Sequence, residues 1–123
     1  MSDWCLYLAA TLLIVTGLVH SVLGDRRLIT PLLSRRDGIL ASDFARFLIR
    51  FAWHLTSVTW AVLAVILVAI AHDPVTARWW ASVATGAAFT GIGFYDLICT
   101  RGRHVGWPLL TGIGLAALLS LAR

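Results

Sequence analysis

The sequence predicts an all-α integral membrane protein, folded as a four-helix bundle in a single domain over residues 1–123. Three observations support this fold class. Hydrophobic residues make up 59% of the chain and charged residues only 13%, the mean hydropathy is +0.86, and the apolar residues fall into four runs, each close to the roughly 20 residues that cross a bilayer. Backbone groups inside a bilayer have no water partners, so such runs form helices. This composition excludes a soluble enzyme, a disordered chain and a disulfide-stapled secreted module.

The expected membrane-spanning helices cover about residues 4–24, 44–71, 77–100 and 105–122. Local signals mark their ends. Ser42 and Asp43 are placed to cap the second helix, and Asp73 with Pro74 to begin the third. Pro108, early in the fourth run, permits a helix that begins near His104.

Arginine supplies every basic side chain, and its distribution predicts the orientation. Most arginines lie between the first and second runs, at the start of the second, or between the third and fourth: Arg26, Arg27, Arg35, Arg36, Arg46, Arg50, Arg101 and Arg103. The opposite side has only Arg78 and Arg123. Cytoplasmic loops are rich in arginine, so we expect both termini to lie outside the cytoplasm.

The segment 25–42 is the only sizeable stretch expected outside the membrane. Leu28, Ile29, Leu32 and Leu33 recur at helical spacing, which predicts a short interfacial helix, with a solvated basic loop as the alternative. The flanking arginines are expected to contact anionic lipid headgroups: Arg26, Arg27, Arg35 and Arg36. A nucleic-acid partner is not expected, because no basic stripe with interleaved aromatic residues lies on a soluble surface.

Ionisable residues within the apolar runs are the candidate functional groups, because charges at membrane depth are costly and usually functional. At 1.5 Å per residue, His20, His54 and Asp96 lie roughly 9–10 Å from the middle of their runs, all toward the cytoplasm. His104 lies about one turn shallower, and Asp25 directly follows the first run. The pattern therefore predicts a polar cluster near the cytoplasmic face.

Three imidazoles and one or two carboxylates suit a transition metal, namely Cu, Zn or Fe. The expected ligands are His20, His54 and His104, with Asp96 as a ligand or orienting group and Asp25 as a further candidate. Haem b is an alternative, with His20 and His54 as its axial ligands and small residues such as Gly24 and Gly93 making room for the ring.

Two other interpretations stay open. The cluster could belong to a non-catalytic subunit and only lock the helices together, with Arg50 pairing with Asp25 or Asp96. It could instead line a pocket for a lipid, a quinone or another substrate. Four short helices enclose little volume, so a homodimer or a larger membrane complex is a further alternative. The pattern does not identify a reaction.

Three segments resemble a group of small, uncharacterised bacterial four-helix membrane proteins. They are His20-Ser21-Val22-Leu23-Gly24-Asp25, Arg50-Phe51-Ala52-Trp53-His54-Leu55-Thr56-Ser57 and Arg101-Gly102-Arg103-His104-Val105-Gly106-Trp107-Pro108. The resemblance spans most of the chain, although members of that group often have glutamate where this chain has Asp25. It implies a bacterial inner-membrane location and no particular activity.

Overall fold

The computed structural model describes residues 2–122, which form helices, turns and short connections without any strand. The all-α class predicted from the sequence is confirmed. The helical elements are α1 (Ser2–Leu18), η1 (Val19–Ile29), α2 (Thr30–Ser34), η2 (Gly38–Ala41), α3 (Asp43–His72), α4 (Ala77–Thr100), α5 (Gly106–Leu119) and η3 (Ser120–Ala122).

Within the described part of the chain, three helical stretches are long and apolar enough to cross a membrane: Trp4–Ser34, Asp43–His72 and Ala77–Thr100. A fourth stretch, Gly106–Ala122, is apolar but shorter. Large apolar side chains cover the outside of the helices, with Ile98 73% and Leu109 70% exposed. A surface of this kind is stable against lipid tails rather than against water.

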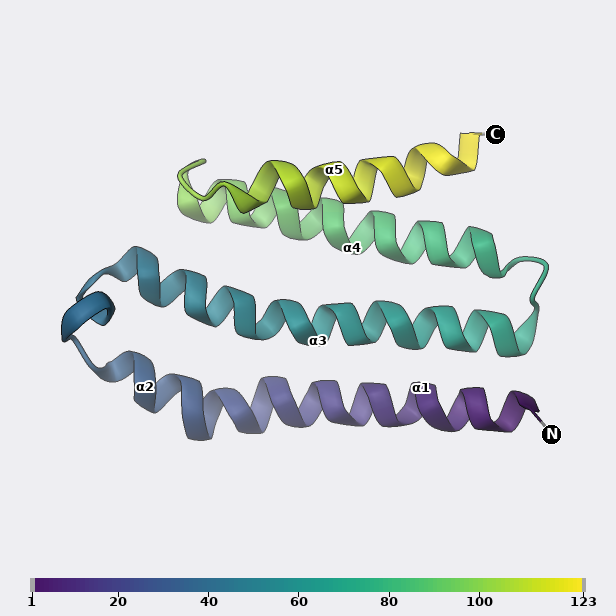
Figure 1. Cartoon of the computed structure of the whole chain (residues 1–123), viewed down its shortest axis with the longest axis horizontal. Helices are drawn as coiled ribbons and strands as arrows, with labels where there is room; N and C mark the ends of the chain where they lie inside the picture. Colours follow the sequence, from purple (N-terminus) through teal and green to yellow (C-terminus); the bar gives the residue numbers. More distant parts are fainter. Residues whose placement is uncertain (1, 123) are drawn as a thin grey trace.

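The helices run antiparallel and lie side by side in one layer, in the order α1, α3, α4, α5 (Figure 1). α1 packs along α3 and α4 packs along α5, whereas the contact between α3 and α4 is less extensive. Both termini lie at one end of the layer, and the α2–α3 and α4–α5 connections lie at the other (Figure 1). The layer is more open than the bundle expected from the sequence, because grooves remain along α3.

The first helix continues ten residues beyond its expected end at Gly24 and stops at Ser34. Its middle part, η1, is a π-helix in which backbone bonds join residues five apart; the last of these runs from the N–H of Thr30 to the carbonyl of Asp25. The leucine-rich pattern that predicted a separate interfacial helix instead extends this one, and Ile29 and Leu33 are buried in it.

The helix ends confirm one expected cap and correct another. Ser42 caps α3, and its hydroxyl accepts a bond from the N–H of Ala45. Asp73 does not cap α4, because its carboxylate accepts bonds from the N–H of Val75 and the hydroxyl of Thr76, which form a turn. α4 therefore begins one turn later than Asp73, at Ala77.

Small residues bring α4 and α5 close together. Gly93 and Gly114 are buried where the two helices meet, and a Cβ atom at Gly93 would lie 2.2 Å from Oγ1 of Thr111. Alanines are buried in the other helix pair: Ala10 on α1 and Ala64 on α3 are each 3% exposed. Packing through small residues is the usual means of helix association in lipid.

Candidate functional site

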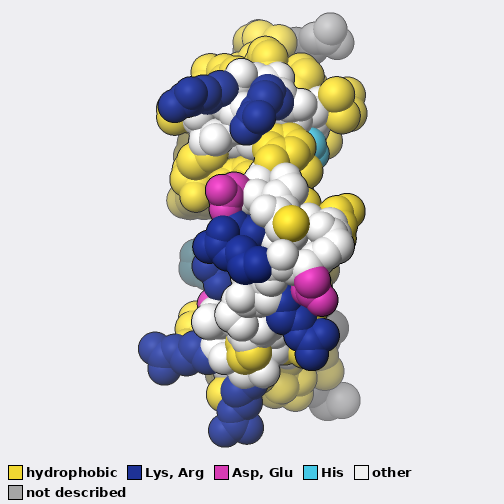
Figure 2. Space-filling model, turned by 90° about the vertical axis from the view of Figure 1, so that its left-hand side faces the viewer, with side chains coloured by type: hydrophobic (Ala, Val, Ile, Leu, Met, Phe, Trp, Pro, Cys, Tyr) yellow, Lys and Arg dark blue, Asp and Glu magenta, His cyan; other side chains and the backbone are white. Residues whose placement is uncertain are grey.

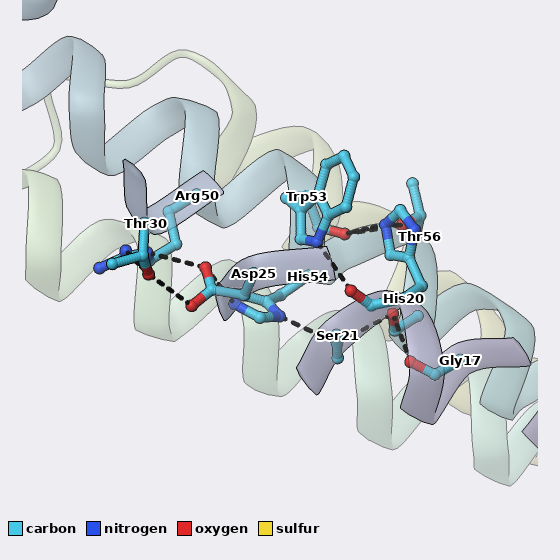
Figure 3. Close-up of polar contacts among 10 residues, drawn as sticks. Gly17, His20, Ser21, Asp25, Thr30, Arg50, Trp53, His54 and Thr56 are labelled. Carbon is cyan, nitrogen blue, oxygen red and sulfur yellow. Dashed lines mark hydrogen bonds and ion pairs between the residues drawn. The ribbon is translucent and has the colours of Figure 1, made fainter. Parts of the chain in front are cut away.

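The structure divides the predicted polar cluster into two parts. One part, which we call the α1–α3 network, joins η1 and α2 to α3 (Figure 3). Its members are Gly17, His20, Ser21, Asp25, Thr30, Arg50, Trp53, His54, Thr56 and Ser57. The other part is the Asp96–His104 pair, in which α4 meets the start of α5.

The π-helix positions the α1–α3 network. Its wide turns place His20, Ser21 and Asp25 on the side that faces α3. His20 and Asp25 are five residues apart, and in an α-helix they would lie further apart around the helix axis. Gly24 lies on the same side and permits close approach, because a Cβ atom there would lie 2.7 Å from Cζ2 of Trp53. Irregular turns of this kind occur frequently at functional sites.

His20 is held by a reciprocal contact with Trp53. The two rings stack with centroids 3.9 Å apart and planes 13° apart. The indole N–H of Trp53 donates to the carbonyl of His20 at 3.1 Å, and Nε2 of His20 lies 3.2 Å from the carbonyl of Trp53. Nε2 also lies 3.0 Å from the hydroxyl of Thr56, whose own hydrogen is directed to the carbonyl of Trp53 at 2.7 Å. Both oxygens therefore accept from Nε2, which offers no lone pair to a metal.

His54 belongs to a chain of hydroxyl groups whose hydrogen directions can be worked out. The hydroxyl of Ser57 donates to the carbonyl of Gly17, so it accepts from Ser21. The hydrogen of Ser21 is then in use, and Nδ1 of His54 donates to its oxygen at 2.9 Å. Nε2, the other nitrogen of His54, lies 3.6 Å from Oδ1 of Asp25.

Asp25 connects the network to the arginines at that end of the layer. Nε of Arg50 donates to Oδ1 of Asp25 at 3.1 Å, and Nη2 donates to the hydroxyl of Thr30 at 3.0 Å. Thr30 in turn donates to Oδ2 of Asp25 at 3.0 Å. Of the two partners considered for Arg50, the structure selects Asp25. The three side chains form a closed ring that ties α2 to α3.

The Asp96–His104 pair is more deeply buried. Asp96 is 0% exposed, and its Oδ2 lies 2.5 Å from Nδ1 of His104. Oδ1 of Asp96 is buried without a hydrogen-bond partner among the described residues. Gly106 makes room for the imidazole, since a Cβ atom there would lie 2.4 Å from Cε1 of His104.

The five residues predicted as metal ligands do not meet at one point. Within residues 2–122, no group of three or more His, Cys, Asp or Glu side chains is placed to hold a metal ion. They form two pairs instead: Oδ2 of Asp96 lies 2.5 Å from Nδ1 of His104, and Oδ1 of Asp25 lies 3.6 Å from Nε2 of His54. At the second pair, the guanidinium of Arg50 already bonds to the same carboxylate oxygen and opposes a second cation there. Metal binding at these residues stays a prediction.

Binding of haem b would require space between the two helices that carry its proposed ligands. Its two proposed axial ligands, His20 and His54, lie on helices that pack directly against each other. The space expected at Gly24 holds the indole of Trp53, and the space at Gly93 holds Thr111. Haem would therefore have to separate these helices before it could bind.

The structure also contains a groove that the sequence analysis did not identify. It lies over α3 between α2 and α4 and has a volume of about 610 Å³. It is lined by Thr30, Leu33, Ser34, Arg46, Phe47, Arg50, Phe51, His54, Leu55, Val58, Ile92 and Tyr95. A signal was present: the polar positions 46, 50 and 54 on α3 run beside the apolar positions 47, 51, 55 and 58, at helical spacing.

The cytoplasmic end predicted from the arginine distribution is strongly basic. Figure 2 shows arginine side chains spread over this end of the layer, with acidic side chains between them. Arg26, Arg27, Arg35, Arg36, Arg101 and Arg103 are exposed. Asp43 pairs with Arg46 and, at 3.5 Å, with Arg36.

Comparison with protein-family models, with curated proteins and with solved structures gives no match to this chain.

Proposed function

We propose that the protein binds an anionic membrane amphiphile in the groove over α3. The observation that carries this proposal is the division of the groove into a basic end and an apolar end. Ligand sites are typically concave and mostly apolar, with a few polar groups that orient the ligand. A volume of about 610 Å³ lies within the range of such sites.

The basic end would hold the acidic head of the ligand. Arg46 and Arg50 line it, and both lie within the first eight residues of α3. The guanidinium of Arg50 is positioned by its bonds to Asp25 and Thr30, while its side chain remains 46% exposed. A phosphate or carboxylate therefore meets a preorganised donor, surrounded by the exposed arginines of the same end.

The apolar end would hold the tail. Leu55 and Val58 line it, beyond a cluster of rings formed by Phe47, Phe51 and Tyr95, whose centroids lie 5.8–6.4 Å apart. Val58 lies twelve residues after Arg46, which corresponds to about 18 Å along α3. A chain of that length parallel to α3 keeps its head at headgroup level and its tail among lipid tails. The open side of the groove admits the ligand directly from the bilayer.

This function implies a defined placement in the membrane. We place four spans in the bilayer, with the arginine-rich end in the cytoplasm and both termini outside. The common end of the termini in Figure 1 supports an even number of spans, and the arginines at the opposite end support the orientation. The bacterial inner membrane is proposed from the sequence resemblance.

Native mass spectrometry of the protein in a neutral detergent tests the proposal. We expect phosphatidylglycerol to remain bound more than phosphatidylcholine does. Arg50→Gln should reduce this preference, and Val58→Trp should fill the apolar end and remove bound lipid while the Arg50–Asp25 pair stays intact. Arg78→Gln, at the opposite end, is the matched control. Equal retention of both lipids by the wild type, or an equal loss in Arg78→Gln, would refute the proposal.

A second candidate is a non-catalytic subunit whose polar groups only hold the helices together. The α1–α3 network favours it, because its hydrogen bonds join η1 to α3 and leave few free polar atoms. In that case Ser21→Ala and Val58→Trp should have different effects. Ser21→Ala should lower stability, whereas Val58→Trp should leave both stability and the lipids that co-purify unchanged.

A further inference from the structure

His104 presents an oriented imidazole to a second groove, on the other side of Phe51. This groove has a volume of about 330 Å³ and lies between the first half of α3 and the start of α5. It is lined by Leu48, Phe51, Ala52, Leu55, His104, Gly106, Leu109 and Leu110. His104 is the one lining residue with a polar side chain. Any polar recognition of a ligand by side chains in this groove therefore depends on its imidazole.

Three contacts hold the imidazole of His104 in place. Oδ2 of Asp96 lies 2.5 Å from Nδ1, the missing Cβ of Gly106 makes room for Cε1, and the ring of Phe51 packs edge-to-face at 6.2 Å. The side chain of His104 is 26% exposed, whereas that of Asp96 is completely buried. The imidazole is thus fixed from behind and accessible from the groove.

The pairing with Asp96 determines what the accessible nitrogen can do. With Asp96 ionised and the imidazole neutral, which is the state that the site requires, Nδ1 of His104 donates to the carboxylate and Nε2 carries the lone pair. Nε2 has no hydrogen bond to the residues that the structure describes. It is therefore an acceptor without a donor, in a groove with otherwise apolar walls. The buried carboxylate strengthens any bond that Nε2 accepts.

We propose that this groove binds a lipid-soluble phenol, whose hydroxyl group donates to Nε2 of His104. A flat ring suits the site because it extends the row of rings formed by Tyr95, Phe51 and His104. An alkyl tail on the phenol would lie along Leu109, whose side chain is exposed on the outside of the helix layer. This site is separate from the basic groove and does not depend on the function proposed for that groove.

Two probes test the site: 4-decylphenol and its methyl ether, in which a methyl group replaces the hydroxyl hydrogen and removes the donor. Binding is measured to the protein in phosphatidylcholine nanodiscs, with empty nanodiscs as the blank. The wild type should bind the phenol about tenfold more tightly than the ether, as expected for one hydrogen bond to a charge-assisted acceptor. Equal binding of the two probes would overturn the proposal, since it would mean that Nε2 does not accept from the ligand.

Three variants locate the effect. His104→Leu should abolish the preference for the phenol, and Gly106→Ala should weaken it by displacing the ring while both His104 and Asp96 remain. His72→Leu, at the other end of α3, should keep the full preference. Circular dichroism confirms the folding of each variant. If His104→Leu does not fold, the preference of Gly106→Ala for the phenol tests the role of His104. Persistence of the preference in the folded variants of this site, or its loss in His72→Leu, would refute the assignment.

Discussion

Replacement of Gly93 by alanine should separate α4 from α5. The added Cβ atom would lie 2.2 Å from Oγ1, 2.6 Å from the backbone nitrogen and 3.0 Å from Cα of Thr111. Two of these three atoms belong to the backbone, so a change of side-chain rotamer cannot relieve the contact. The helices must therefore move apart.

The structure provides a matched control on the same helix. Gly91 lies two residues earlier, and a Cβ atom there would have nothing within 4 Å. Overpacking a close interface costs about 1–3 kcal/mol, whereas alanine in place of an unhindered helical glycine gains up to about 1 kcal/mol. We therefore expect Gly93→Ala to lower the free energy of unfolding by about 1–3 kcal/mol and Gly91→Ala to leave it unchanged or raise it.

Unfolding is followed by circular dichroism as the mole fraction of sodium dodecyl sulfate rises in mixed micelles. The two variants should move the midpoint in opposite directions, or Gly91→Ala should not move it at all. If Gly93→Ala unfolds at the same midpoint as Gly91→Ala, then α4 and α5 do not pack through Gly93. The account of this interface would then be wrong.

Three further predictions concern the α1–α3 network and the orientation. Gly24→Ala should displace the indole of Trp53 from the ring of His20, lower the free energy of unfolding by about 1 kcal/mol and change the near-ultraviolet circular dichroism; an unchanged spectrum would contradict the stacking. Ser21→Ala should leave Nδ1 of His54 without its partner and cost about 1 kcal/mol in the same detergent titration, a result that full stability of the variant would disprove. Reporter fusions at position 40 and at the C terminus should report opposite compartments, and a cytoplasmic C terminus would reverse the orientation.

The sequence predicts the position of a polar residue along its helix better than it predicts the residue's neighbours. Counting residues gives the positions of His54 and Asp96 along α3 and α4 because the rise per residue of an α-helix is constant. Position along a helix is only one coordinate, however, and the sequence does not give the side-by-side order of the helices. In the structure α3 lies between α1 and α4, so Asp96 and His20 belong to separate sites.

The connection between the first two long helices shows a second limit. The spacing of Leu28, Ile29, Leu32 and Leu33 predicts helix correctly, but an expected break at Gly24 does not occur. A single glycine weakens a helix without ending it. The α-helical spacing of these leucines does not indicate the π-helical geometry of η1. The pairing of Arg50 with Asp25 depends on that geometry.

The eleven residues of η1 also determine how far α1 is rotated about its own axis relative to α3. Apolar residues surround α1 on every side, so its own sequence selects no preferred face toward α3. Deletion of one residue from η1, such as the exposed Val22, would let the backbone return to α-helical turns and rotate everything before it by about 100°. Ala10 would then turn away from its buried position. An insertion or deletion in this short segment would therefore change which surface the N-terminal helix shows to the lipid, although no residue of that helix had changed.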